Sequence, residues 1–153
     1  MAGAVLQAEP ILRALQAAFC HDMPRAELLQ LVARQIHEAG PPYTGVYLYM
    51  LHGEELRLEA LEGRPTEHTS IPVGTGICGR AVAERRDLNV PDVAAAPGYL
   101  ACSLETRSEL VVLIRRHDEI LGQIDIDSDV QDGFNEAEEA AVREVADALA
   151  VLL

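Results

Sequence analysis

The stretch ELVVLIRRHDEILGQIDID, residues 109–127, decides the fold, because it holds two apolar strands joined by a short polar turn. ELVVLI (109–114) and ILGQIDID (120–127) flank residues 115–119, a pattern typical of a β-hairpin. An earlier hairpin is predicted from VYLYML (46–51) and LRLEAL (56–61). Strands joined by such short turns pair in antiparallel fashion. The sequence therefore predicts an antiparallel sheet.

Helical patterns lie on both sides of these strands. Asn135 is a candidate N-cap with Glu138 three residues later, and apolar residues then continue to Leu153. The other elements expected are helices at 5–19, 24–36 and 76–84, a strand at 88–90, and loops at 62–75 and 91–107. We predict an α+β fold in a single domain of residues 1–153. Its N- and C-terminal helices pack on one face of the sheet, and a loop-covered ligand pocket lies on the other.

Composition excludes several classes of function. The chain has 153 residues, of which 49% are hydrophobic, enough to bury a core. The formal net charge of −13 argues against nucleic acid and anionic membranes as partners. Because the chain contains no lysine, covalent Schiff-base chemistry is excluded. No signal peptide or membrane-spanning run is visible, so we expect a cytoplasmic protein with free thiols.

Two carboxylates interrupt an otherwise apolar strand. Asp125 and Asp127 are two positions apart, so their side chains point to one face and the neighbouring isoleucines to the other. With a turn around His117, Glu109 is predicted roughly opposite Asp125. Three carboxylates in one cavity need a cation or a shared proton, and a ligand ammonium group would satisfy them. The alternative is that both aspartates face solvent at a sheet edge.

The three cysteines differ in their surroundings. Cys78 follows a glycine-rich turn at the start of a short helix, where the helix N-terminus is expected to lower a thiol pKa. The alternative for Cys78 is a buried, small apolar residue. Cys102 lies in the long loop, seven positions before Glu109, and Cys20 is predicted to be a packed or surface thiol. No paired cysteine or histidine spacing indicates zinc, so neither a metal nor a cofactor is predicted.

Most of the chain resembles the GAF domain family, and within it the free methionine-(R)-sulfoxide reductases. The segments that carry the resemblance are IPVGTGICGRAVA (71–83), NVPDV (89–93), PGYLACSLETRSELVV (97–112), GQIDIDS (122–128) and FNEAEE (134–139). His68 departs from the pattern, because the family usually has a further cysteine at that place.

The resemblance implies a catalytic set. Cys102 matches the cysteine of the family's Ala-Cys loop, the nucleophile, and Cys78 matches a candidate resolving thiol. Glu109 and Asp127 match acids that hold the substrate and assist at the sulfoxide. The residues implied in substrate binding are Glu109, Asp125, Asp127, Tyr43, Tyr47 and Ala101.

Two functions remain open at this point. The first is an oxidoreductase that reduces free L-methionine-(R)-sulfoxide through a cysteine nucleophile, with a thioredoxin-like protein as reductant. The second is a GAF domain that senses a small zwitterionic ligand in signalling and has no catalytic activity. Under either hypothesis we expect a homodimer, because the apolar C-terminal helix is suited to pairing with another chain.

Overall fold

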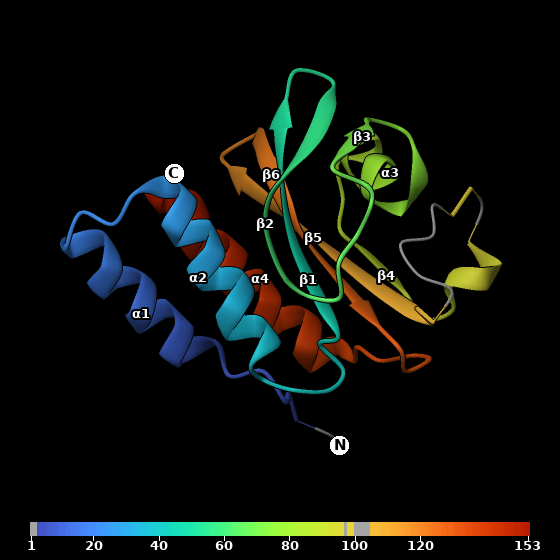
Figure 1. Cartoon of the computed structure of the whole chain (residues 1–153), viewed down its shortest axis with the longest axis horizontal. Helices are drawn as coiled ribbons and strands as arrows, with labels where there is room; N and C mark the ends of the chain where they lie inside the picture. Colours follow the sequence, from blue (N-terminus) through green and yellow to red (C-terminus); the bar gives the residue numbers. More distant parts are fainter. Residues whose placement is uncertain (1–2, 97, 100–104) are drawn as a thin grey trace.

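The computed structural model describes residues 3–96, 98–99 and 105–153. These residues form a sheet with helices on both of its faces (Figure 1). In chain order the elements are α1 (Ala8–Cys20), α2 (Arg25–His37), β1 (Gly45–His52), β2 (Glu55–Gly63), β3 (Ser70–Pro72), α3 (Gly76–Glu84), β4 (Leu88–Val90), the 3-10 turn η1 (Val93–Ala95), β5 (Ser108–Arg116), β6 (Glu119–Ser128) and α4 (Glu136–Leu152).

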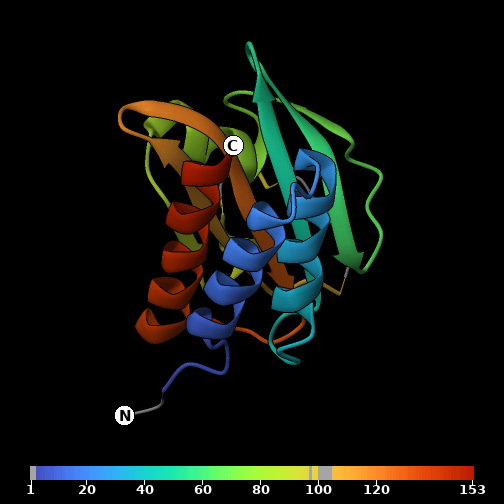
Figure 2. The same cartoon turned by 90° about the vertical axis from the view of Figure 1, so that its left-hand side faces the viewer.

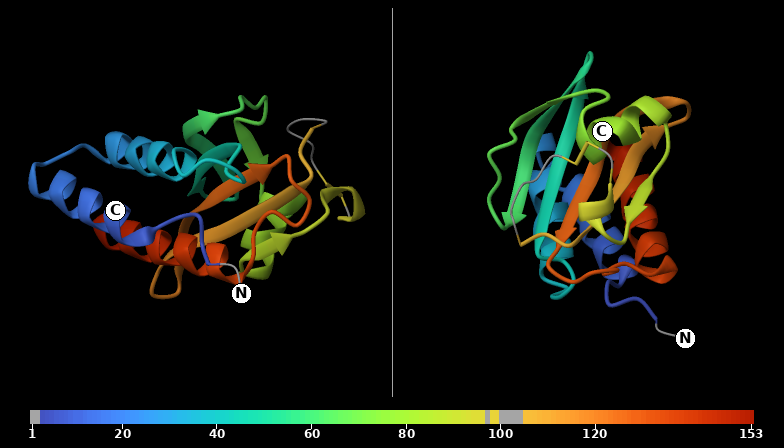
Figure 3. Two further views of the ribbon diagram at one scale, coloured as in Figure 1. Left: turned by 90° about the horizontal axis from the view of Figure 1, so that it is seen from below. Right: turned by 90° about the vertical axis from the view of Figure 1, so that its right-hand side faces the viewer.

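The six strands lie in the order β3-β2-β1-β6-β5-β4, each antiparallel to its neighbours. Strand β6 is therefore central, between β1 and β5. Helices α1, α2 and α4 cover one face of the sheet (Figure 2). Helix α3 lies on the opposite face (Figure 3). The predicted α+β fold, with terminal helices on one face of an antiparallel sheet, is confirmed.

Each central strand contributes to two separate cores, because successive side chains point to opposite faces. In β1, Val46 and Leu48 pack against the long helices, whereas Tyr47 and Tyr49 pack toward α3. The same alternation continues in β5 and β6. The α3-side core is the smaller of the two, and it contains Cys78. A site that includes Cys78 must therefore be lined by side chains that point to the α3 face.

Residues 62–75, predicted to be mostly loop, contain one short strand that the sequence did not indicate. Ser70–Pro72 form β3, which pairs with the beginning of β2 at the edge of the sheet. A strand of three residues is too short to show the alternation from which strands are recognised in sequence.

Helix α4 begins as expected but uses its capping glutamate differently. The Asn135 Oδ1 atom accepts a hydrogen bond from the Glu138 amide at 2.9 Å. The Glu138 carboxylate accepts hydrogen bonds from the amides of Val5 and Leu6, at 2.6 and 3.1 Å, and from the Tyr43 hydroxyl at 2.5 Å. Burial and this hydrogen bond raise the pKa of Tyr43 above its usual range. One buried carboxylate thus fastens the chain before α1 and the turn before β1 to α4.

We expect Glu138→Ala to lower the free energy of unfolding by about 2–4 kcal/mol, because it leaves three donors, two of them buried, without an acceptor. Urea denaturation measures this directly. Glu136→Ala, an exposed position in the same helical turn, is the matched control and should change stability by less than about 1 kcal/mol. Equal effects of the two substitutions would contradict this role of Glu138.

Candidate functional site

Three carboxylates meet on the α3 face in the middle of the sheet. Asp125 and Asp127 lie on β6, and Glu109 on β5 pairs directly with Asp127. Their exposed fractions are only 1%, 1% and 4%. The alternative that the aspartates face solvent at a sheet edge is therefore excluded.

Glu109 is predicted roughly opposite Asp125, to within a residue or two, and the structure pairs it with Asp127, at the limit of that range. The turn consists of His117 and Asp118, and the register shifts between Ile114 and Arg115, where Leu121 is the extra residue of β6. A bulge inserts one residue into one strand of a pair. Together, the turn position and the bulge move the partner of Glu109 from Asp125 to Asp127. A shift of two keeps all three acids on one face, because the side-chain period of a strand is two.

Cys78 is held against the acids by a tight connection between β3 and α3. Gly76 begins α3 with φ of +64°, which only glycine adopts at little cost. A Cβ atom at Gly79 would lie 2.5 Å from the Pro72 carbonyl oxygen, so the helix approaches β3 closely only because this residue is glycine. From the sheet, the Gln123 side-chain amide donates to the Cys78 carbonyl oxygen at 3.0 Å.

The thiol and two of the acids form one cluster. The Cys78 Sγ atom donates to Glu109 Oε2 at 3.6 Å. One ligand-type atom from each of Cys78, Glu109 and Asp125 lies within 4.8 Å of the others. Among the described residues, the Asp125 carboxylate interacts with Glu109 and Cys78 inside the cluster and has no hydrogen-bond partner outside it. The cluster is therefore rich in negative charge and short of donors.

Burial controls the protonation of this cluster. Burial raises the pKa of Asp125, against smaller lowering contributions from Glu109 and Cys78. It also raises the pKa of the Cys78 thiol well above its usual value, with further contributions from the charges of Asp125 and Glu109. The expectation that the helix N-terminus lowers this thiol pKa is therefore wrong. The free-energy cost of burying a thiolate charge exceeds the favourable interaction of that charge with the N-terminus of the short helix.

A small pocket opens onto the cluster. It is bordered by residues of β3, α3, β5 and the segments before them. These residues are His68, Ile71, Thr75, Gly76, Ile77, Cys78 and Glu109. The cavity volume is about 10 Å³, close to what one water molecule needs, so these residues leave room for little more than a water molecule or an ion.

The remaining predicted site residues fall in different places. Tyr47 is beside the acids, because it pairs with Asp125 across β1 and β6, and its hydroxyl donates to the Arg64 carbonyl oxygen at 2.7 Å. Tyr43 does not lie beside the acids, because it belongs to the helix-side core and its ring contacts Phe134. It lies before β1 begins, so the alternation of the strand does not extend to it.

The other cysteines complete this comparison. Cys20 is an exposed free thiol, in agreement with the prediction of a packed or surface position. Cys102 and Ala101 lie outside the residues that the structure describes.

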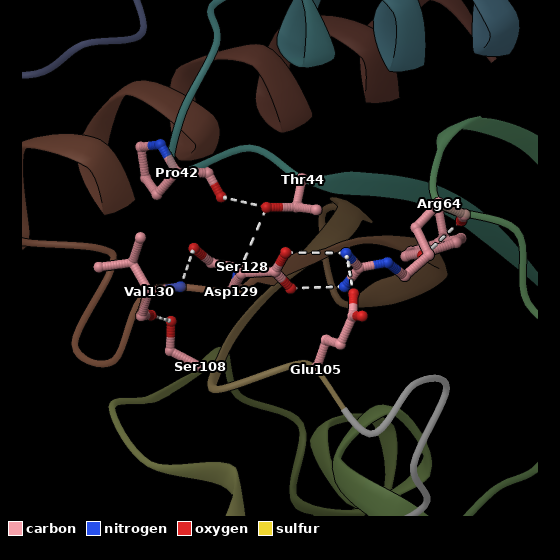
Figure 4. Close-up of polar contacts among 9 residues, drawn as sticks. Pro42, Thr44, Arg64, Glu105, Ser108, Ser128, Asp129 and Val130 are labelled. Carbon is pink, nitrogen blue, oxygen red and sulfur yellow. Dashed lines mark hydrogen bonds and ion pairs between the residues drawn. The ribbon is translucent and has the colours of Figure 1, made fainter.

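An arginine clamp joins the strand ends next to the acids (Figure 4). Arg64, just after β2, donates two hydrogen bonds to Asp129, just after β6, at 2.5 and 2.8 Å. The same guanidinium donates to Glu105 at 2.9 Å. The hydrogen bond lowers the pKa of the Asp129 carboxyl. Because Tyr47 also bonds to the Arg64 backbone, the clamp connects the wall of the site to the segment that leads into β5.

Sequence reasoning missed Gln123 and Arg64. Gln123 is fully buried and shares the face of Asp125 and Asp127, so the spacing Gln-x-Asp-x-Asp was the available signal. Arg64 has no comparable signal. Its partners are 41 and 65 residues away in the chain and come together only in the fold.

Comparison with known proteins places this arrangement in a family. Residues 24–153 match the GAF domain family. Protein YtsP of Bacillus subtilis is 36% identical over 107 residues, which are 70% of this chain and 65% of that protein. The chain thus spans less than two thirds of that curated relative.

Solved structures give the same result. The type II free methionine-R-sulfoxide reductase from Thermoplasma acidophilum is 38% identical, with a TM-score of 0.81 over 84% of this chain and 91% of that one. The free methionine-R-sulfoxide reductase from Neisseria meningitidis, in complex with its substrate, is 29% identical. Its TM-score is 0.84 over 93% of this chain and 85% of that one.

The chain belongs to the GAF domain family, because the match covers every element from α2 to α4. The resemblance to the free methionine-(R)-sulfoxide reductases within that family is also confirmed, and those relatives are oxidoreductases. In the part of the chain that the structure describes, every helix is too short or too polar to cross a bilayer.

We expect Asp125→Asn to raise the melting temperature at neutral pH by about 3–6 °C, equivalent to about 1–2 kcal/mol. An amide removes the charge that burial disfavours and adds donors toward Glu109. The pKa of Asp125 is raised in the folded state. In the wild-type protein this carboxyl therefore lowers the free energy of unfolding increasingly as pH rises from its unfolded-state pKa toward its folded-state pKa. The gain should therefore be larger at pH 8 than at pH 5 in calorimetric scans.

Asp132→Asn, at an exposed position after β6, is the control for this measurement and should leave the melting temperature nearly unchanged. A destabilised Asp125→Asn protein would mean that the Asp125 carboxylate is paired favourably in the fold.

Proposed function

We propose that this chain is a free L-methionine-(R)-sulfoxide reductase. The observation that carries the proposal is the buried thiol of Cys78 beside Glu109 and Asp125, where Cys78 and Glu109 also border a small cavity. The relatives named as free methionine-R-sulfoxide reductases support the same chemistry. A protein with this activity needs a thiol nucleophile, a second thiol, a proton donor and a site for a free amino acid.

The acids supply the site for the amino acid. Free methionine sulfoxide carries an ammonium group, and a cation is what three buried carboxylates require. Asp125 is the carboxylate with the strongest need, because among the described residues its oxygens have no hydrogen-bond partner outside the cluster. A peptide-bound methionine has no ammonium to offer, so this arrangement selects the free amino acid.

Cys102 is the nucleophile in this proposal, on the strength of the family resemblance. Its thiolate attacks the sulfoxide sulfur while a protonated acid donates to the sulfoxide oxygen. The oxygen passes to the cysteine, which becomes a sulfenic acid, and methionine leaves as the reduced thioether. Glu109 and Asp127 were the donors expected from the sequence.

Cys78 then resolves the sulfenic acid. Its sulfur attacks the sulfur of Cys102, the hydroxyl group of the sulfenic acid leaves as water, and a disulfide forms. The Cys78 thiol is a poor nucleophile as it stands, because burial raises its pKa. Glu109, whose Oε2 already accepts from the Cys78 sulfur, is placed to take that proton during the attack. Glu109 thus acts as a base for Cys78.

A thioredoxin-like dithiol would return the disulfide to two thiols, which completes a two-electron reduction of the sulfoxide. A reducing cytoplasmic location and a homodimer are further parts of the proposal. His68 stands where the family usually has another cysteine, so the scheme assigns resolution to Cys78.

The test is turnover of free methionine-(R)-sulfoxide coupled to thioredoxin and its reductase. We expect Cys102→Ser to lose activity by about 10³-fold or more, because no other nucleophile replaces it. Cys78→Ser should still produce one methionine per protein but fail to recycle with thioredoxin. Cys20→Ser, at an exposed thiol on α1, is the matched control and should keep full activity. Unchanged turnover in Cys102→Ser would contradict the proposed mechanism.

The second candidate function is a ligand-sensing GAF domain without catalysis. The observation that favours it is the burial of Cys78 and the raised pKa of its thiol, which suit a packing residue as well as a reactive one. Under this hypothesis calorimetry detects binding of the free amino acid, whereas the coupled assay detects no turnover in the wild-type protein. Measurable turnover that depends on Cys102 excludes it.

A further inference from the structure

The Cys78, Glu109 and Asp125 side chains have roles in the proposed reductase, and together they also form a set of metal-ligand atoms. They come from α3, β5 and β6, and their Sγ and carboxylate oxygen atoms lie within 4.8 Å of one another. A sulfur and two carboxylate oxygens facing a common centre are metal-ligand atoms.

The spacing within the set matches a tetrahedral ion. Zinc binds cysteine sulfur at about 2.3 Å and carboxylate oxygen at about 2.0–2.2 Å, so two such ligands on one ion are roughly 3.5 Å apart. The Cys78 Sγ atom is 3.6 Å from Glu109 Oε2. These two side chains would hardly have to move to share an ion.

Asp125 provides a second, independent observation. Its side chain is 1% exposed, and among the described residues its oxygens have no hydrogen-bond partner outside the cluster itself. A carboxylate buried in this way is strongly disfavoured unless a cation accompanies it. The oxygens belong to the same cluster as the thiol, so an ion held by Cys78 and Glu109 would also satisfy Asp125.

The pocket supplies an approach and an open fourth position. It reaches Cys78 and Glu109 from outside and is bordered by His68, a residue type that commonly binds zinc. The strongly negative chain also favours cations over anions. Sequence spacing could not indicate this set, because its members are 16 to 47 positions apart and none belongs to a paired cysteine or histidine motif.

We propose that Cys78, Glu109 and Asp125 bind a divalent cation of the zinc class, with one coordination position open to the pocket. On binding, the thiol releases its proton to solvent and the thiolate coordinates the ion. The ion is an inhibitor and takes no part in the reductase reaction. It occupies the acids that would hold the substrate ammonium group, and this last point rests on the proposed function.

Cobalt titration of the reduced, metal-free protein tests the site directly. Co²⁺ reports on zinc sites, because a thiolate ligand gives a near-ultraviolet charge-transfer band and tetrahedral geometry gives intense visible bands. We expect both features at one equivalent of Co²⁺, and their loss when Zn²⁺ is added. Absence of a thiolate band in the wild-type protein would overturn the proposal.

Variants locate the ion. Cys78→Ser should abolish the charge-transfer band, and Asp125→Asn should weaken Co²⁺ binding by at least about tenfold. Loss of binding in Asp125→Asn cannot be attributed to unfolding if its melting temperature rises as expected. Cys20→Ser should retain the band. A band that persists in Cys78→Ser but disappears in Cys102→Ser would place the ion elsewhere and overturn the assignment.

Metal binding and catalysis are separable in this design. The cobalt spectra require no turnover, so a protein that binds Co²⁺ through Cys78 but reduces no sulfoxide keeps the metal site and loses the reductase. In an active protein, Zn²⁺ should raise the apparent KM for the sulfoxide without lowering kcat, and a chelator should reverse the effect. A fall in kcat at unchanged KM would contradict competition for the acids.

Discussion

The burial of Asp125, Asp127 and Glu109 at the centre of the sheet is the constraint on which the rest of the site depends. Carboxylates there are removed from water on a face that α3 covers. Burial raises the pKa of the Cys78 thiol most, and the charge of these acids raises it further. The same charge disfavours anionic ligands and creates a demand for a cation or a shared proton. Ligand choice, the protonation of the thiol and the cost to stability all follow from this one placement.

The two faces of the sheet treat buried acids in opposite ways. On the helix side, Glu138 accepts three hydrogen bonds and fastens the N-terminal segment and Tyr43 to α4. On the α3 side, the oxygens of Asp125 have no hydrogen-bond partner outside the cluster among the described residues. The buried acid on the helix side therefore stabilises the fold, whereas the buried acids on the α3 side destabilise it. Perturbed acids of this kind are typical of functional sites.

Much of the fold could be predicted from local pattern, because hairpins, the α4 cap and the short helix at Cys78 each have a signal within a few residues. The shared face of Asp125 and Asp127 followed from strand alternation alone. The exact partner of Glu109 did not, since it depends on the bulge at Leu121, whose one local signal is the neighbouring Gly122. The Arg64 clamp and the burial of Cys78 depend on contacts between distant segments, and the pKa of Cys78 follows from that burial.

The most direct test of the central claim is the affinity of the Asp125→Asn protein for free L-methionine-(R)-sulfoxide, measured by calorimetry beside the wild type. If the buried acids hold the ammonium group, the substitution should weaken binding by about tenfold or more, since hydrogen bonds to charged groups contribute about 1.5–3 kcal/mol. This loss should occur in a protein that is at least as stable as the wild type. Equal affinity for the two proteins would show that Asp125 does not hold the ligand.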